Sequence, residues 1–308
     1  MTGGAGFIGS HLVDKLIDLG YRVTVVDDFS LGKKENLIQH KGSSYLKVCK
    51  KSICDNLLSI FKKGKFHIVF HLAAIPRVQY SIDYPLESHD TNINGTLNLL
   101  KLSRAFGVKR FIFSSSSSIY GDQKQATQTE ELAPNPMSPY ALHKLTGEYY
   151  CKLFYKIYGM ETVSLRYFNV FGPRQDPHSQ YSNLIPKFIK FAIDGKIPKI
   201  NGDGQQKRDF TFVADVVNAN VLAGTTKNRN CLGETFNVGS GKNISVNEIT
   251  DKILTLTGSL VRPVHGPTLI EPRETLAGLE KSRKLLGWSP KYNLDQGSRV
   301  IYKSLTRM

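Results

Sequence analysis

A glycine-rich segment near the N-terminus constrains the fold of this chain more than any other feature. The segment Thr2-Gly3-Gly4-Ala5-Gly6-Phe7-Ile8-Gly9 carries glycines at positions 3, 6 and 9. Glycines at this spacing allow a tight turn from a strand into a helix and a close approach of the backbone to a phosphate. We expect a helix from about Phe7 to Leu19 whose first amides face a pyrophosphate. The predicted dinucleotide contacts are Gly3, Gly6, Phe7, Ile8 and Gly9.

An acidic residue after this loop indicates which dinucleotide the site takes. Asp27 follows the predicted strand Tyr21–Val26. A carboxylate at this place accepts a hydrogen bond from a ribose 2′-hydroxyl and repels a 2′-phosphate. The glycine loop and Asp27 together predict NAD as the cofactor, in preference to NADP.

Short apolar runs alternate with longer amphipathic stretches through the first two-thirds of the chain. The runs that predict strands are Tyr21–Val26, Ile68–Leu72, Arg110–Phe113 and Thr162–Leu165. Helical periodicity extends over 86–106 and 139–158, and Ser138 and Gly159 are expected to cap the second of these helices. This alternation predicts an α/β protein with a doubly wound parallel sheet. After Gly172 the pattern loosens, which indicates a smaller C-terminal lobe.

Composition excludes several classes of protein. Of the 308 residues, 40% are hydrophobic and 22% are charged, which excludes collagen, disulfide-stapled miniproteins and intrinsic disorder. The sequence shows no run near the roughly 20 apolar residues of a membrane span and no signal-peptide pattern. The net charge of +15 is spread over separate segments, so we expect a solvated basic surface and no nucleic-acid partner. The spacing of the cysteines predicts reduced thiols in the cytoplasm and no metal site. The cysteines are Cys49, Cys54, Cys151 and Cys231.

The start of the chain is unusual for such a fold. A central strand is expected before the glycine loop, yet Met1 alone precedes Thr2. Removing that strand would leave backbone groups of its neighbours unpaired. We therefore expect either a natural chain that begins several residues upstream or a misassigned start codon.

The segment Tyr140-Ala-Leu-His-Lys144 places a phenol and an ammonium one helical turn apart. A nearby cation stabilises a phenolate, so Lys144 is expected to lower the pKa of Tyr140 and make it a general base. The run Ser114–Ser118 follows an apolar strand and can supply a hydroxyl to the same site. Together with the glycine loop, this order of motifs predicts an enzyme.

Longer segments resemble one known family. Five segments resemble the motifs of extended short-chain dehydrogenases/reductases. They are TGGAGFIG at 2–9, HLAA at 71–74, TNINGT at 91–96, SSSSSIYG at 114–121 and YALHK at 140–144. Three further segments resemble the NAD-dependent epimerase/dehydratase branch of that family, and within it UDP-glucose and UDP-N-acetylglucosamine 4-epimerases. These segments are RYFNVFGPRQDP at 166–177, NLIPKF at 183–188 and INGDGQQKRDFTFV at 200–213.

This resemblance implies an architecture. A Rossmann domain that binds NAD is expected over 1–168, with a return segment near 210–240, and a lobe that binds a UDP-sugar is expected mainly over 169–308. The family also implies a homodimer joined by a four-helix bundle, here formed by the helices 86–106 and 139–158.

The resemblance also implies site residues. The expected catalytic residues are Ser116, Tyr140 and Lys144, with Ser115 and Ser117 as alternatives for the serine. Further cofactor contacts are expected at Leu72, Ala73, Ala74, Asn92, Tyr140 and Lys144. Substrate contacts are expected at Ser116, Asn169, Asn183, Leu184 and Arg208. The chain departs from the family at Ser52, where an aspartate often lies near the adenine, and at Thr268, where an arginine often lies near the pyrophosphate; Arg273 is a candidate substitute.

The expected reaction is 4-epimerisation of a UDP-hexose or UDP-N-acetylhexosamine through a transient 4-keto sugar. The 4,6-dehydratases and decarboxylases of the same family need a further acid–base group, and their acidic residues align with Ser117 and Ser118 of this chain. These two reactions remain alternatives, as does a non-catalytic member that binds NAD or RNA.

The expected sugar preference depends on Thr275, ten residues before Leu285. In similar epimerases this position faces the 2-substituent of the sugar, where a small residue leaves space for an N-acetyl group. Thr275 therefore predicts activity on UDP-N-acetylglucosamine and UDP-N-acetylgalactosamine, alongside the plain hexoses. The alternative is that Thr275 is a packing residue with no contact to the sugar.

Overall fold

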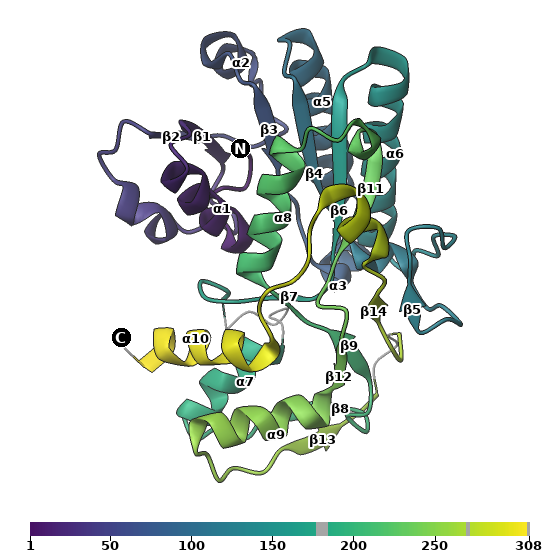
Figure 1. The fold of residues 1–308 in the computed structure, drawn as a ribbon. Helices are drawn as coiled ribbons and strands as arrows, with labels where there is room; N and C mark the ends of the chain where they lie inside the picture. Colours follow the sequence, from purple (N-terminus) through teal and green to yellow (C-terminus); the bar gives the residue numbers. More distant parts are fainter. Residues whose placement is uncertain (177–183, 269–271, 307–308) are drawn as a thin grey trace.

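A parallel β-sheet forms the centre of the molecule (Figure 1). The computed structural model describes residues 1–176, 184–268 and 272–306. Four strands are hydrogen-bonded in the order β11-β6-β4-β3. Their bounds are Glu234–Val238, Glu161–Tyr167, Arg110–Ser116 and Ile68–His71. A further parallel pair is formed by β1 (Val23–Asp27) and β2 (Leu46–Lys50). The predicted parallel α/β fold is confirmed.

Met1 and Thr2 lie where a central strand was expected. Thr2 forms parallel bridges to Val26 of β1 and to His71 of β3. The amide of Val26 donates to the carbonyl oxygen of Met1 at 2.8 Å, and the amide of Thr2 donates to that of Phe70 at 3.0 Å. Thr2 therefore joins the pair β1-β2 to the four strands β11-β6-β4-β3. An upstream extension of the natural chain stays a prediction.

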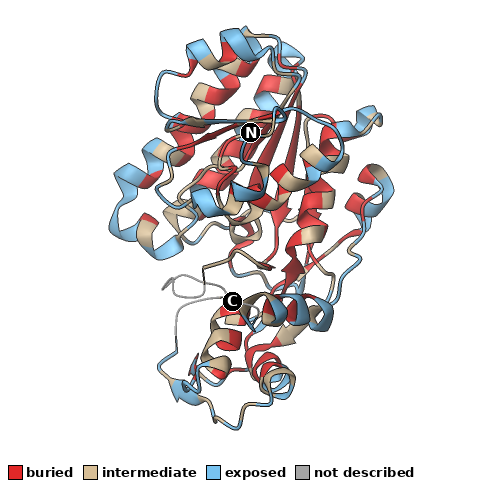
Figure 2. Cartoon of the chain, turned by 90° about the vertical axis from the view of Figure 1, so that its left-hand side faces the viewer, coloured by how far each residue is buried: buried red, intermediate tan, exposed pale blue. Residues whose placement is uncertain are grey.

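Helices cover both faces of the sheet (Figure 1). One face packs against α1 (Phe7–Asp18) and α8 (Val213–Thr225), and the other against α2 (Leu58–Gly64), α5 (Gly95–Ala105) and α6 (Pro139–Tyr158). Alternation along β4 supplies both cores, because Ile112 joins the first and its neighbours Phe111 and Phe113 join the second. Figure 2 shows the buried residues concentrated on the strands and on the helix faces turned toward them.

The helix α6 has the predicted ends. The Ser138 hydroxyl accepts a hydrogen bond from the amide of Ala141 at 3.2 Å, and Gly159 adopts a left-handed conformation with φ of 67°. The other expected helix differs, because α4 (Pro85–His89) passes through a π-helical turn, η2 (Asp90–Asn94), into α5. The strand β4 also extends three residues beyond Phe113, into the serine run.

A smaller lobe lies at one end of the sheet (Figure 1). Its helices α7 (Leu184–Ile193), α9 (Val246–Thr257) and α10 (Leu294–Thr306) pack against one another. Its paired strands are β8 (Lys199–Asn201) with β13 (Val264–Gly266), and β9 (Lys207–Asp209) with β12 (Asn243–Ser245). Between α7 and α9 in the sequence, α8 returns the chain to the sheet.

Short elements connect the two regions. The paired strands among them are β7 (Val170–Phe171) with β10 (Thr211–Phe212), and β5 (Thr127–Gln128) with β14 (Leu276–Ala277). The remaining helices and helical turns are η1 (Lys34–His40), α3 (Val78–Asp83), η3 (Ser117–Tyr120), η4 (Arg229–Cys231) and η5 (Ser282–Leu286).

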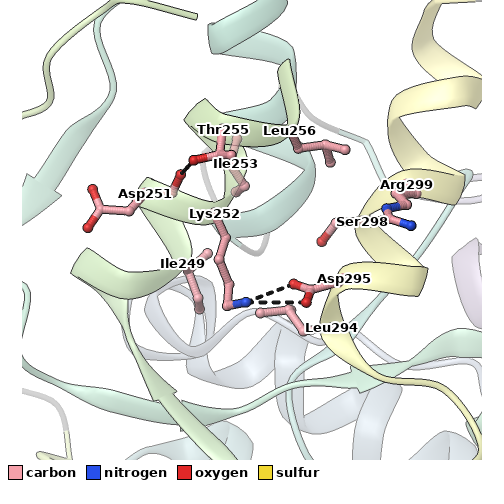
Figure 3. A pocket seen from close by; sticks show the side chains of 10 residues that line it. All are labelled: Ile249, Asp251, Lys252, Ile253, Thr255, Leu256, Leu294, Asp295, Ser298 and Arg299. Atoms are coloured by element: carbon pink, nitrogen blue, oxygen red, sulfur yellow. Dashed lines mark hydrogen bonds and ion pairs between the residues drawn. The ribbon is translucent and has the colours of Figure 1, made fainter. Parts of the chain in front are cut away.

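A surface hollow of about 330 Å³ lies between α9 and α10 (Figure 3). An ion pair of 3.0 Å between Lys252 and Asp295 joins its two sides. The hollow contains none of the predicted site residues. Within the described ranges, no helix is long and apolar enough to cross a membrane.

Candidate active site

The glycine loop makes a tight turn before α1. Gly3 has a φ of +67°, and a Cβ on it would lie 2.6 Å from the amide nitrogen of Ala73. A side chain is therefore excluded at Gly3 both by conformation and by space. At Gly6 a Cβ would meet, within 4 Å, only the carbonyl oxygen of Gly3, so that side of the loop is open. An open glycine ahead of a twelve-residue helix fits the diphosphate of a dinucleotide.

The predicted loop contacts lie together in the structure. Phe7 and Ile8 are the first residues of α1, and both are half-buried against the core. Gly9 is buried in the same helix turn and lies against the backbone of Gly3.

Asp27 ends β1 next to the glycine loop. Its carboxylate accepts hydrogen bonds from the amide of Ala5 and from the amide of Phe29, each at 2.9 Å. Burial raises the pKa of Asp27, and these two amides act in the opposite direction. The carboxylate thus fixes the glycine loop to the end of β1, at the place where a ribose was predicted.

The loop after β3 lies against the glycine loop. The amide of Leu72 donates to the carbonyl oxygen of Thr2 at 3.2 Å, and the amide of Ala73 donates to the hydroxyl of Thr2 at 3.3 Å. Ala74 continues the same loop. The predicted cofactor residues 72–74 are therefore adjacent to Gly3.

Asn92 holds this loop from the π-helical turn η2. Its Oδ1 accepts a hydrogen bond from the amide of Ile75 at 2.8 Å, and its Nδ2 donates to the carbonyl oxygen of Ile75 at 3.1 Å. Asn92 is buried and uses both ends of its amide in these contacts. In this structure Asn92 thus positions the loop that carries the predicted cofactor contacts.

His71, the first residue of the HLAA segment, is polar and buried. Its ring nitrogens lie 2.8 Å from the hydroxyl of Thr2 and 2.8 Å from the hydroxyl of Thr96. Burial, then the charge of Lys144, lower the pKa of His71 to about 3, so the ring is neutral at pH 7. His71 therefore ties the start of the chain to α5.

Tyr140 meets the serine run at the end of β4. The side chain of Ser116 lies near enough to the Tyr140 phenol to lower its pKa against the effect of burial. The neighbouring hydroxyls have other partners, since Ser114 contacts Tyr167 at 2.9 Å and Ser115 donates to Glu148. Of the serines that the sequence left open, Ser116 is thus the one in contact with Tyr140.

Lys144 lies beneath the same site. Its ammonium donates to the carbonyl oxygen of Ser114 at 2.7 Å and lies 5.9 Å from the centre of the Tyr140 ring. Burial lowers the pKa of Lys144 to about 8. The sequence-based expectation of a lowered pKa for Tyr140 is wrong for this structure, because burial of the phenol raises it while the bond to Ser116 acts the other way.

A buried ion pair lies next to these residues. The guanidinium of Arg166 donates to Glu148 through Nε at 2.9 Å and through the Nη2 atom at 2.8 Å. Sequence reasoning missed this pair. Two signals pointed to it: Glu148 is one helical turn beyond Lys144, and Arg166 is a charge inside the apolar strand β6.

Three of the predicted substrate residues, Asn169, Arg208 and Thr275, lie on β9 or contact it. Asn169 donates from Nδ2 to the carbonyl oxygen of Asp209 at 3.2 Å, and Arg208 donates to the carbonyl oxygen of Lys207 at 2.8 Å. Leu184 is the first residue of α7. Asn183 lies outside the described residues.

Thr275 belongs to the same group. It is buried, and its hydroxyl accepts a contact of 3.5 Å from the amide of Asp209. Arg273, the candidate for the pyrophosphate, pairs instead with Asp203 at 3.0 and 2.9 Å. Asn169, Arg208 and Thr275 therefore meet at β9, whereas Ser116, the other predicted substrate contact, ends β4.

Comparison with known proteins decides the family. The model of the NAD-dependent epimerase/dehydratase family matches residues 1–239. The chain belongs to this family. Because the family is NAD-dependent and the glycine loop and Asp27 fit a dinucleotide, NAD is the cofactor of the chain.

Relatives match over nearly the whole length of this epimerase/dehydratase family member. The UDP-glucose 4-epimerase of Mycolicibacterium smegmatis is 36% identical over 300 residues, which cover 96% of this chain and 95% of that protein. The structure of UDP-glucose 4-epimerase with UDP-glucose from Thermotoga maritima is 38% identical, with a TM-score of 0.93 and coverage of 99% of this chain and 97% of that one. The UDP-N-acetylglucosamine 4-epimerase from Methanobrevibacter ruminantium, in complex with UDP-N-acetylmuramic acid, is 36% identical, with a TM-score of 0.94 and coverage of 100% and 97%.

Proposed function

We propose that this chain interconverts UDP-sugars that differ in configuration at C4, using bound NAD. The observation that carries the proposal is that Tyr140 lies beside Ser116, with the Lys144 ammonium 5.9 Å from the centre of its ring. UDP-hexoses and UDP-N-acetylhexosamines are the proposed substrates, because 4-epimerases named for each class are similar to this chain over nearly its whole length.

In the proposed mechanism, the chain's own residues move one proton. Tyr140 removes the proton from the sugar 4-hydroxyl and later returns it. Ser116 donates a hydrogen bond to the reacting oxygen, and the Lys144 ammonium, 5.9 Å from the ring centre, is the positive charge that we propose offsets the effect of burial on the phenolate. NAD, when bound, supplies the acceptor and then the donor of hydride. The 4-keto sugar turns over between the two transfers, so the reaction needs no net oxidant.

The proposed roles of the other residues follow from their places. Around the cofactor, Asp27 binds the ribose, the glycine loop binds the diphosphate, and Asn92 orients residues 72–74. On the substrate side, the proposed contacts are Asn169, Asn183, Leu184, Arg208 and Thr275. A guanidinium such as that of Arg208 suits phosphate oxygens.

Dehydratase and decarboxylase reactions are less well supported. Both need an additional acid–base group beside the 4-keto sugar. The positions next to Ser116 are Ser117 and Ser118, which begin the turn η3 and carry no carboxylate.

The test is a substrate panel followed by proton NMR. Purified protein incubated with UDP-glucose, UDP-galactose and their N-acetylated counterparts should give the C4 epimer of each, with no added oxidant. Accumulation of a stable 4-keto product, or release of carbon dioxide, would reject the proposal in favour of the other two reactions.

We also propose that two copies associate through α4 and α6. These helices present large apolar side chains to solvent, and on α6 they recur at helical spacing. The most exposed of them are Leu86, Leu142, Tyr149, Leu153 and Ile157, at 81%, 52%, 54%, 47% and 64%. A second copy that covered this face would form the four-helix bundle expected from the family.

Light scattering after size-exclusion chromatography tests the dimer. The paired change Leu153→Glu and Ile157→Glu should give a monomer. Ile38→Glu is the matched control, because Ile38 is 63% exposed on η1, away from α6. Dissociation by both changes, or by neither, would reject this interface.

The four cysteines, all within the described residues, are free, and we infer a reducing compartment such as the cytoplasm.

A further inference from the structure

The ion pair between Glu148 and Arg166 is buried to an unusual degree. Each of the two side chains is about one-twentieth exposed, at 5% and 6%. The guanidinium lies between the Glu148 carboxylate and the ring of Tyr120, 4.7 Å from the ring centre. The cost of removing two charges from water is large, and replacing such a pair by apolar residues is often neutral or stabilising. Stability therefore does not explain why charges occupy this place.

The carboxylate of Glu148 has two links to the proposed catalytic residues. It accepts a hydrogen bond from the hydroxyl of Ser115, the residue before Ser116. It also lies one turn beyond Lys144 on the same face of α6, where its charge favours the protonated amine against the effect of burial.

We propose that Glu148 is a positioning residue for the reaction: its carboxylate keeps the buried Lys144 ammonium charged and fixes the strand end that carries Ser116. The inference rests on the proposed function of Tyr140 and Lys144. Arg166 completes the arrangement, because it neutralises the carboxylate and holds it in one orientation through two hydrogen bonds.

Other groups around Lys144 do not supply this charge. On α6, His143 has its pKa lowered to about 4, chiefly by burial, and on β3 the pKa of His71 is lowered to about 3. Both rings are therefore neutral at pH 7. The strand β4 contributes the carbonyl of Ser114 and the face of Phe113, 5.1 Å from the ammonium. Among the described residues, Glu148 is the anion that acts on Lys144.

The experiment measures the titration of Lys144 directly, by NMR of protein labelled with ¹³C at the lysine ε-carbon. The Lys144→Met spectrum identifies the signal. In Glu148→Gln the apparent pKa of Lys144 should fall by about 1 unit or more, since a neighbouring opposite charge is lost. The alkaline limb of the dependence of kcat on pH should shift to lower pH by a similar amount. Activity that needs the ammonium is lost as the pH rises through the pKa of Lys144.

Ser115→Ala is the matched control. It removes a hydrogen bond to Glu148 but keeps the charge, so it should leave the Lys144 titration in place. If Glu148→Gln does not fold, the paired change Glu148→Gln with Arg166→Met removes the uncompensated guanidinium and should show the same fall.

The outcomes separate the two proposals. An unchanged Lys144 pKa in the folded Glu148 variants, or an equal fall in Ser115→Ala, would overturn the role of Glu148. A Lys144 titration that behaves as expected in a protein without epimerase activity would instead support the effect of the Glu148 charge on Lys144 and overturn the proposed function.

Discussion

The ammonium of Lys144 donates a hydrogen bond to the carbonyl oxygen of Ser114, two residues before the serine that contacts Tyr140. One strand end thus fixes both the cation and the hydroxyl on which the phenol depends. The backbone of β4 defines their separation, because the strand is bonded to β3 on one side and β6 on the other. Changes at these side chains should therefore alter chemistry more than the fold.

Tyr140→Phe removes the phenolic hydroxyl and keeps the ring. We expect turnover of UDP-sugars to fall by about 100-fold or more, the usual contribution of a general acid–base group, while NAD stays bound. Steady-state kinetics and the NAD content of the purified protein measure the two effects. Tyr149→Phe, an exposed tyrosine on the same helix, is the control. Turnover near the original rate in Tyr140→Phe would mean that another group acts as the base.

Asp27→Ala removes the carboxylate that meets both the glycine loop and the predicted ribose. NAD binding should weaken and discrimination against NADP should relax, because a hydrogen bond and a charge repulsion disappear together. Calorimetric titration with each dinucleotide measures the preference. Asp28→Asn is the control. The Asp28 carboxylate is exposed and accepts hydrogen bonds from Ser30, so this change should alter neither the affinity for NAD nor the discrimination against NADP. An unaltered preference in Asp27→Ala would show that the ribose lies elsewhere.

Thr275→Tyr tests the sugar preference. Steric exclusion of a small group costs about 1–3 kcal/mol, or about 10- to 200-fold in specificity. kcat/KM for the N-acetylated UDP-sugars should fall by that order while UDP-glucose is largely spared. Thr275→Val separates the contact of the hydroxyl with Asp209 from the effect of size, and should affect both sugars equally. Equal losses on both sugars in Thr275→Tyr would assign Thr275 to packing.

His71→Gln should make the free energy of unfolding depend less on pH in the acid range. The unfolded chain takes up a proton on this ring near its ordinary pKa of 6.5, whereas the folded chain does so at about 3. Unfolding therefore binds a proton between these values, and stability is lost as pH falls through them. Removing the ring should reduce the slope of the unfolding free energy by about 1.4 kcal/mol per pH unit between pH 6 and 4.

Urea unfolding at several pH values measures that slope. Thr96→Val is the control, since it removes a partner of the ring and keeps the ring itself. It should lower stability at every pH without altering the slope. A slope in His71→Gln that equals that of the unchanged protein would contradict a buried neutral His71.

Much of the fold was predictable because its signals are local. Strand runs around Val25, Ile112 and Val163 are continuous and apolar, since both faces of a parallel sheet are buried. The ends of α6 were predictable for the same kind of reason: Ser138 and Gly159 act through contacts within a few residues of themselves. The π-helical turn at Asp90–Asn94 was not, because it depends on the contact of Asn92 with Ile75, in another part of the chain.

The motif residues of the site could be identified before the fold was known, because the chemistry of a glycine, a phenol or an ammonium belongs to the residue and its near neighbours. The packed fold was needed to show which serine lies beside Tyr140, in which direction the pKa of Tyr140 moves, and that Glu148 and Arg166 form a pair. These outcomes depend on burial and on contacts between residues distant in sequence. Burial and long-range contacts arise only when the sheet and its helices have packed together.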